Sequence, residues 1–386
     1  MGYLTGPPPS PYNGRLNKII NGQCNIDQLN EGAVVSAAIN GTFQSIDGFS
    51  AVMSNFSAGA LLLQQQLLTT FTGGAWDIGT SSVSPNQRGL AIVTNTDAGL
   101  NGKLRHIVES NHLDIFNAAS NATGTPTRDA IFAFKFIPSL AYQNAQAGQV
   151  FKLGVIFTYG GQEFVTSANL SFASSAVQSL YQGVAICPFS QFPNKVLWAS
   201  GNNLIIDINI GGTASLPVVL QNTWKGVGGN FGQTTIGLST LAGTFLFTDF
   251  VLQLPGQVLQ YTKPGYVEDL IACQRYFEKS FVNGTAPASN AGNSGVEAYD
   301  AVLAGVNNYS IPVRYQVPKF SVPVVTTFNP GAAGAAWRNI TSAANSGAAT
   351  INNSSTNGFT LRNAQAAGDA AGNNIGIHWI ANARLS

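Results

Sequence analysis

Few side chains in this sequence are of the types that carry out acid–base, metal or nucleophilic chemistry. The histidines are His106, His112 and His378. The first two lie six positions apart, which fits neither a helical metal pair at i and i+4 nor the HExxH pattern. His378 alternates with Ile377 and Trp379, which indicates a surface or satisfied histidine on a strand. No GxSxG elbow, Walker loop or CxxC pair is present, so the sequence predicts neither a cofactor nor a metal site.

Carboxyl groups are the remaining candidates for catalysis. Cleavage of a glycan needs two of them held roughly 5 to 10 Å apart. The 17 Asp and Glu residues leave room for such a pair, but no DxE or ExxxD cluster falls on a recognisable strand. The chain also has no fixed-period repeat of the kind that builds a β-helix. We therefore expect no enzymatic activity, and a glycan depolymerase stays as an alternative hypothesis.

The composition favours binding through neutral groups. Charged residues make up 9% of the chain, against about 25% in an average soluble protein. Eighteen basic and 17 acidic residues give a net charge of +1, and no basic stripe is present that could neutralise a row of phosphates. The most apolar stretch, AGALLLQQQLL at 58–68, is too short and too rich in glutamine to span a bilayer. These features predict neither nucleic-acid binding nor membrane insertion.

Sugar binding fits this composition better. Neutral Asn, Gln, Ser and Thr side chains form hydrogen bonds with hydroxyl groups, and exposed aromatic rings can stack on sugar faces. Trp76, Trp198 and Trp224 lie in stretches that contain Gly, Pro or Asn, which are typical of loops. These three tryptophans are candidate sugar-binding platforms. The alternative for each ring is that it fills the core of a β-sandwich.

Short strands dominate residues 19–262. Examples are IFAFKFI (131–137), FKLGVIFTY (151–159) and TFLFTDFVLQL (244–254), which are rich in β-branched and aromatic residues. Most runs alternate apolar and polar residues and are separated by turn signals such as Asn-Gly and Gly-Gly. This pattern predicts an all-β protein whose first module, 19–262, is a jelly-roll-like β-sandwich.

Residues 263–283 differ from their surroundings because charged residues crowd into them. Glu268 and Asp269 would complement the dipole of a first helical turn, and Lys279 that of a last turn. One face of the predicted helix consists of Leu270, Ile271, Cys273, Phe277 and Phe281. Arg275 and Glu278 are three residues apart and would pair on the other face. We therefore predict an amphipathic helix that links two β modules.

The ends of the chain complete the predicted organisation. Alternating runs resume in 284–386, which predicts a second, smaller β-sandwich. Residues 1–18 form an arm rich in Pro and Gly, with Tyr3 followed by Pro7, Pro8 and Pro9 in a stretch that favours an extended polyproline conformation. Such an arm is either a frayed terminus or a peg that docks into another protein.

The predicted helix also carries a resemblance to a known family. The family pattern reads L-x-x-C-Q-R-Y-Y-E-K-S, and Phe277 replaces its second tyrosine. The matching positions are Cys273, Gln274, Arg275, Tyr276, Glu278, Lys279 and Ser280. Supporting matches are IINGQCNIDQLNEG at 19–32, IDGF at 46–49, LRHIVE at 104–109, VLQL at 251–254 without the family's following glutamate, and ANARL at 381–385. In these segments the chain resembles tail-fibre, head-fibre and other host-facing proteins of tailed bacteriophages.

This resemblance implies a location and partners. It implies a virion surface protein made in the host cytoplasm, with a jelly roll similar to carbohydrate-binding modules, a smaller C-terminal module and homotrimeric assembly. The first hypothesis is a fibre or spike subunit on the tail, collar or capsid that binds host-surface polysaccharide, with the arm docked to other virion proteins. The second is a capsid or tail decoration protein that binds virion proteins alone. The depolymerase is the third.

Overall fold

The computed structural model of the chain describes residues 17–33, 35–36, 41–54, 61–67, 88–94, 101–113, 116, 128–176, 178–193, 203–210, 223–226, 243–256, 265–304 and 308–384. The chain divides into two compact units. Unit 1 comprises Met1–Asn25 and Gly32–Glu268, and unit 2 comprises Ile26–Glu31 and Asp269–Ser386. The short segment Ile26–Glu31, which lies within the first module of the sequence-based division, therefore packs with the C-terminal residues.

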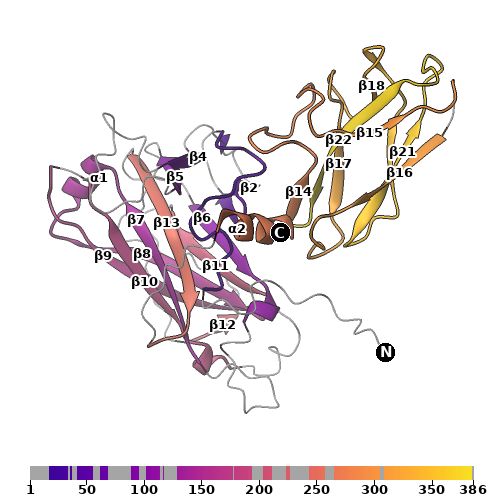
Figure 1. The fold of residues 1–386 in the computed structure, drawn as a ribbon. Helices are drawn as coiled ribbons and strands as arrows, with labels where there is room; N and C mark the ends of the chain where they lie inside the picture. The colour runs from indigo at the N-terminus through magenta and orange to yellow at the C-terminus, as the bar shows by residue number, and fades with distance from the viewer. Residues whose placement is uncertain are drawn as a thin grey trace. The chain divides into compact units, whose positions relative to one another are not determined.

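Unit 1 is a sandwich of two antiparallel sheets (Figure 1). The first sheet runs in the order β1 (Val35–Ser36), β4 (Leu61–Leu67), β5 (Arg88–Thr94), β13 (Gly243–Gln253), β7 (Ala130–Ile137) and β10 (Tyr181–Cys187). The second runs in the order β12 (Lys225–Gly226), β9 (Gln162–Ser171), β8 (Val150–Tyr159), β11 (Leu204–Asn209), β6 (Asn101–Val108), β3 (Phe49–Ser54) and β2 (Gly41–Ile46). A short helix, α1 (Leu140–Ala145), follows β7. Neighbours in each sheet are mostly distant in sequence, and the prediction of a jelly-roll-like β-sandwich is confirmed.

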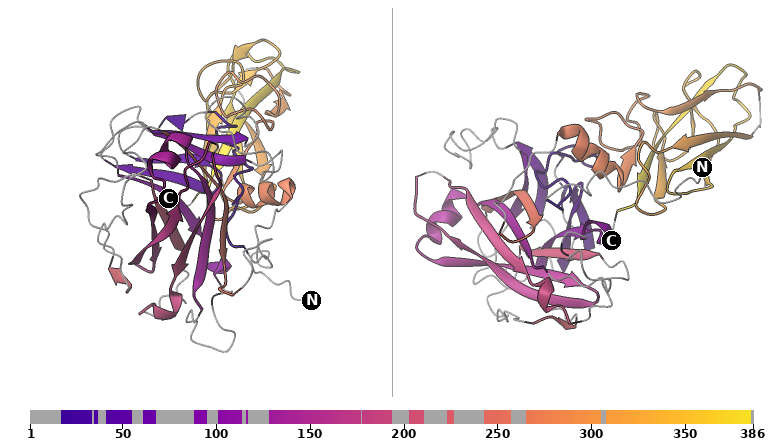
Figure 2. Two further views of the ribbon diagram at one scale, coloured as in Figure 1. Left: turned by 90° about the vertical axis from the view of Figure 1, so that its left-hand side faces the viewer. Right: turned by 60° about the horizontal axis from the view of Figure 1, so that its bottom comes forward.

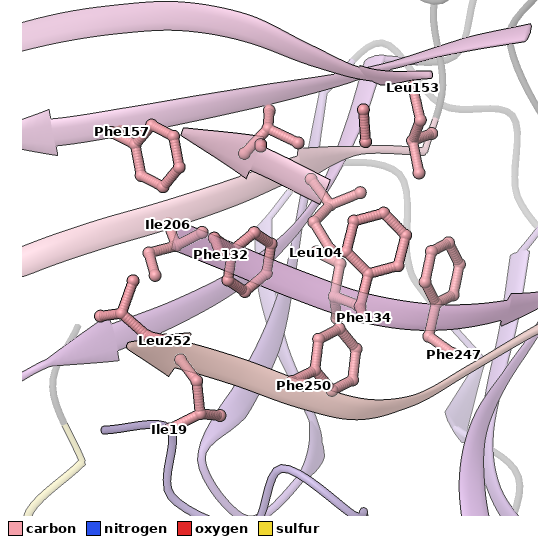
Figure 3. Close-up of a cluster of buried hydrophobic side chains, with 14 of the residues drawn as sticks. Ile19, Leu104, Phe132, Phe134, Leu153, Phe157, Ile206, Phe247, Phe250 and Leu252 are labelled. Carbon is pink, nitrogen blue, oxygen red and sulfur yellow. The ribbon is translucent and has the colours of Figure 1, made fainter. Parts of the chain in front are cut away.

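Aromatic side chains from the first sheet fill the space between the two sheets (Figure 3). Phe132 and Phe134 of β7 pack beside Phe247 and Phe250 of β13, with Leu104 of β6 facing them from the other sheet. Burying each such ring contributes roughly 1.5–3 kcal/mol. This core explains why β7 and β13 read as near-continuous apolar runs.

A β-bulge in β13 lets two phenylalanines reach the same core. The register with β7 shifts between Thr248 and Val251, and Asp249 has a φ of 51°. Residues three positions apart point to opposite faces of a regular strand. The extra residue of the bulge resets this alternation, so that Phe247 and Phe250 both point inward. The carboxylate of Asp249 forms an ion pair with Lys135 of β7, at 2.6 Å between Oδ2 and Nζ.

The last residues of the predicted arm belong to the sandwich. The backbone N–H of Lys18 donates to the carbonyl of Leu252 at 3.0 Å, and Asn17 Nδ2 donates to the carbonyl of Phe250 at 2.9 Å. The chain therefore lies along β13 from Asn17 onward. Tyr3, Pro7, Pro8 and Pro9 lie outside the described residues.

Unit 2 is a smaller sandwich built around one long strand, β22 (Asn374–Asn382). This strand pairs with β14 (Phe277–Lys279), β17 (Val324–Phe328), β15 (Glu297–Asp300) and β18 (Arg338–Asn339), and β18 pairs with β19 (Ala344–Asn345). The other sheet runs in the order β16 (Asn308–Arg314), β21 (Gly358–Ala364) and β20 (Ala349–Asn352). Their shared core includes Val313, Trp337, Phe359, Leu361, Ile375, Ile377 and Trp379. Figure 2 shows the strands of this unit in two further views. The predicted second β module is confirmed.

The predicted helix is shorter than expected. It is α2, which spans Tyr266–Gln274, and Phe277 and Glu278 lie in strand β14 instead. Positions four apart share a face both in a helix and in a strand, so the spacing of Phe277 and Phe281 could not tell the two structures apart. After Gln274 the backbone takes a different partner, because Phe277 pairs with Asn382 of β22.

The exposed side of α2 also differs from the prediction. Cys273 is buried, as expected, but Ile271 is 37% exposed and Asp269 is 1% exposed. The helix therefore buries a polar and small-residue side that includes Asp269, Ala272 and Gln274. The apolar stripe proposed from the sequence is wrong at Ile271.

His106 of β6 gives unit 1 a dependence on pH. Its ring packs against Phe49 at 4.7 Å between centroids, and its Nδ1 lies 2.7 Å from the carbonyl oxygen of Gly48. Because that oxygen can only accept, Nδ1 carries the proton of a neutral ring. Desolvation by burial lowers the pKa of His106 from 6.5 to about 4.

We expect the free energy of unfolding to fall as the pH is lowered from 6.5 to about 4. The unfolded chain takes up the proton near pH 6.5 and the folded chain only near pH 4, so this contribution is complete above pH 6.5 and is lost below it. The expected loss is about 3 kcal/mol. Urea unfolding of the wild type and of His106→Gln between pH 4 and 7 measures it. Equal pH dependence in the two proteins would contradict this assignment.

Candidate functional site

A buried ion pair joins Glu278, in the segment that follows α2, to Lys319. Lys319 donates hydrogen bonds to Glu278 Oε2, to the carbonyl of Gln274 and to the carbonyl of Val317, the last at 3.1 Å. The side chains of Lys319 and Glu278 are 0% and 5% exposed, respectively. Desolvation lowers the pKa of Lys319, and the charge of Glu278 opposes that shift. Since Gln274 is the last residue of α2, the ammonium group also satisfies a carbonyl at the helix C-terminus.

The pairing predicted between Arg275 and Glu278 is wrong. Arg275 lies instead with its guanidinium carbon 5.8 Å from the ring centroid of Phe320, and Tyr276 stacks on the same ring at 5.9 Å. On a continuous helix positions 275 and 278 would share a face. The helix ends before them, so Glu278 faces Lys319.

Three of the segments that carry the family resemblance, 19–32, 273–280 and 381–385, contact one another inside unit 2 through Gln28, Glu31 and Ala383. Gln28 Nε2 donates to the carbonyl of Phe277 at 3.1 Å, and Lys279 forms an ion pair with Glu31. The N–H of Ala383 donates to the carbonyl of Tyr276 at 2.7 Å. Three stretches that are far apart in the sequence therefore form one framework around β14. The residues that the sequence analysis singled out here pack within the fold: Leu270 is half-buried and Cys273 is buried.

Ser280 and His378 form a pair that resembles a nucleophile and its base. Ser280 Oγ lies 3.0 Å from His378 Nδ1, and His378 Nε2 lies 2.9 Å from the carbonyl oxygen of Gly292. The carbonyl fixes the proton on Nε2, so Ser280 donates to Nδ1. The imidazole is 0% exposed and stacks on Phe281 at 4.0 Å. Because Ser280 Oγ also accepts from the N–H of Trp379 at 3.0 Å, the pair fastens the end of β14 to β22.

Of the three candidate tryptophan platforms, Trp224 is the one that lies within the described residues. Trp224 is 7% exposed, donates from Nε1 to the carbonyl of Pro188 at 3.0 Å and packs on Phe192 at 4.9 Å. It belongs to the core of unit 1, which is the alternative left open by the sequence. Trp76 and Trp198 lie outside the described residues.

The outer face of the sheet formed by β16, β21 and β20 is the best candidate for ligand binding. Its described side chains, which we call the arginine face, are Asn308, Ser310, Pro312, Arg314, Thr350, Asn352, Thr360 and Arg362. Ser310, Arg362 and Thr350 form one cross-strand row, and Pro312, Thr360 and Asn352 form the next. Residues directly opposite in an antiparallel sheet share a face.

The strand alternation explains how this face arises. The intervening residues, such as Val313, Phe359 and Leu361, point into the core of unit 2. Pro312 lies on the outer strand β16, where a missing N–H costs no ladder hydrogen bond on the solvent side. All positions of the face in β16 are exposed, as are Thr350 and Arg362, whereas Thr360 and Asn352 are half-buried.

The charges of the arginine face are all positive. It carries Arg314 and Arg362 and no carboxylate among its described residues. Neither guanidinium forms an ion pair or a side-chain hydrogen bond with another described residue. The alternation in IPVRYQV and GFTLRN indicates that both arginines point away from a core. The sequence alone, however, could not place the two arginines on one sheet.

Two further observations concern the described residues. In the described part of the chain, no group of three or more His, Cys, Asp and Glu residues could hold a metal ion. Within the same residues, no helix is long and apolar enough to cross a membrane.

Comparisons with known proteins give only distant likenesses. No family model matches the chain, and no curated protein matches it. Among solved structures, the CBM22-1–GH10 modules of xylanase 10B from Clostridium thermocellum, complexed with xylohexaose, match 62% of this chain with 11% identity and a TM-score of 0.26. The match spans 29% of the length of the xylanase chain. Discoidin II from Dictyostelium discoideum matches 84% of this chain and 98% of its own, with 10% identity and a TM-score of 0.17.

Removing one partner of the Glu278–Lys319 pair should destabilise unit 2 strongly. Lys319→Met leaves the buried carboxylate of Glu278 without its cation, and we expect a loss of about 3–5 kcal/mol in the free energy of unfolding. The double variant Glu278→Leu/Lys319→Met should recover part of that loss, because no charge is then left buried. Denaturant unfolding monitored by tryptophan fluorescence measures both effects, with the exposed Lys225→Met as the control. A loss below about 1 kcal/mol in Lys319→Met would show that the pair behaves like an exposed ion pair.

Proposed function

We propose that this protein is a structural protein of a bacteriophage virion, a fibre or spike subunit that binds glycans of the host-cell surface and catalyses no reaction. The arginine face of unit 2 is the observation that carries the glycan-binding part. It presents hydroxyl, amide and guanidinium groups on the outer face of a sheet, most of them at exposed positions.

The chemistry of this face suits sugar hydroxyls. Ser310, Thr350 and Thr360 each offer a hydroxyl group that both donates and accepts, and Asn308 and Asn352 add amide donors and acceptors. Neighbouring strands lie about 4.8 Å apart, and side chains on one face recur about every 6.6 Å along a strand. The spacing of the polar side chains on this face is therefore similar to the spacing of adjacent sugar rings in a glycan. Pro312 adds an apolar ring against which C–H groups can pack.

The phage-family resemblance supports the virion setting. Three of the segments that carry it form mutual contacts around β14, for example between Gln28 and Phe277. The low content of charged residues, 9%, suits a subunit that packs against copies of itself and other virion proteins, because small polar faces lose little on desolvation. We propose a homotrimer on the exterior of the tail, collar or capsid.

Binding of the purified, fluorescently labelled chain to an array of bacterial capsular and lipopolysaccharide glycans tests the proposal. We expect saturable binding to at least one glycan. The variant Ser310→Ala/Thr350→Ala/Asn352→Ala removes polar groups from exposed or half-buried positions of the face, and we expect it to bind at least tenfold more weakly. The matched control is Gln182→Ala/Asn169→Ala, which changes two exposed polar residues of unit 1.

Two results would contradict the proposal. The first is binding to isolated phage particles but to no glycan, which would favour a decoration protein. The second is release of reducing ends from a bound polysaccharide, abolished by replacing a single carboxylate, which would make the chain a depolymerase.

A further inference from the structure

We propose that the arginine face binds an anionic polysaccharide, one that carries carboxylate or phosphate groups, through Arg314 and Arg362. This inference rests on the proposed function and names the ligand class of the same site. It follows from the separation of charge within unit 2.

Unit 2 as a whole is neutral in formal charge, because its Lys and Arg residues equal its Asp and Glu residues in number. Its acidic residues lie away from the arginine face. Glu31 and Glu278 pair with lysines, Glu297 accepts from Trp379, Asp300 from Asn374, Asp369 from Asn339 and Ser346, Asp27 from the N–H of Asn30, and Asp269 is buried in α2.

The other basic side chains of this unit are engaged as well. Lys279 and Lys319 form the two ion pairs, and Arg338 donates to Asn345 at 3.1 Å. The guanidinium carbon of Arg384 lies 4.2 Å from the ring centroid of Phe277. Arg275 contacts Phe320. Arg314 and Arg362, by contrast, are exposed and form no ion pair, side-chain hydrogen bond or ring contact with another described residue.

The geometry places these two cations along one line of the sheet. Arg362 lies opposite Ser310, and Arg314 lies opposite Gly358, so the two arginines are four residues apart along the paired strands. That spacing is about 13 Å. The row that contains Thr360 lies between them. An extended anionic chain running along β21 would therefore meet a guanidinium, then hydroxyl groups, then a second guanidinium.

Gly358 keeps the space beside Arg314 open. A Cβ added at Gly358 would lie 2.2 Å from the carbonyl oxygen of Val313, so the close approach of the strands requires glycine there. No side chain therefore lies directly across the strand pair from Arg314. A planar guanidinium can bind carboxylate or phosphate in a bidentate manner.

Binding measurements on the intact chain test this inference. The probes are polygalacturonate, a glycerol-phosphate teichoic acid, neutral dextran and duplex DNA, at 50 and 300 mM salt. We expect binding to at least one of the two acidic glycopolymers, several-fold weaker at the higher salt concentration because exposed charges are screened. We expect no binding to dextran and much weaker binding to DNA.

Variants locate the effect on the face. Arg314→Gln/Arg362→Gln should weaken binding of the acidic polymer at least tenfold and reduce its salt dependence. Arg314→Lys/Arg362→Lys should recover part of the affinity, since it keeps the charge and loses the bidentate geometry. Lys225→Gln, which removes an exposed cation from β12 of unit 1, should leave binding unchanged. Unchanged melting temperatures confirm that the variants fold.

Three outcomes would overturn the inference. They are equal binding of dextran and the acidic polymers, full binding by the double glutamine variant, and DNA binding as tight as that of the acidic polymers. If the glycan array finds a neutral ligand that depends on Ser310, Thr350 and Asn352, the proposed function stands and this inference fails. If the array finds no ligand, the proposed function itself fails.

Discussion

The buried pair of Glu278 and Lys319 is the interaction on which the rest of unit 2 depends. It joins the last carbonyl of α2 to β14, and β14 in turn pairs with β22. Glu278 Oε1 also accepts from the N–H of Gln316, which follows β16 closely. A buried ion pair is not in itself a large source of stability. Leaving either buried charge without its partner is strongly destabilising, however, so the fold must keep Glu278 and Lys319 together. The pair therefore ties the end of the helix to the strand that follows it.

The elements with the strongest alternation could be predicted from the sequence. The strands β7, β8 and β22 lie where β-branched and aromatic runs placed them, because their side chains fill a core on at least one face. Two details could not be predicted, since they depend on partners distant in sequence. The bulge at Asp249 turns Phe247 and Phe250 to the same side, and Glu278 lies in β14, where it pairs with Lys319.

The candidate site shows the same limit. Alternation alone indicates that Arg314 and Arg362 point away from a core, yet only the register of β16 with β21 sets them four residues apart on one face. For Trp224 the sequence left two environments open, and the neighbouring Phe164, Phe189 and Phe192 decide between them. Unit 2, which has no net formal charge, can thus present a positively charged surface because its carboxylates are engaged elsewhere, as Glu31 and Asp369 are.

The most direct test of anionic-glycan binding by the arginine face is a crystal structure of the protein with a short acidic oligosaccharide such as trigalacturonate. We expect electron density for the sugar over β16, β21 and β20, with carboxylates within hydrogen-bonding distance of Arg314 or Arg362. Ligand density on another surface, with this sheet left bare, would contradict it.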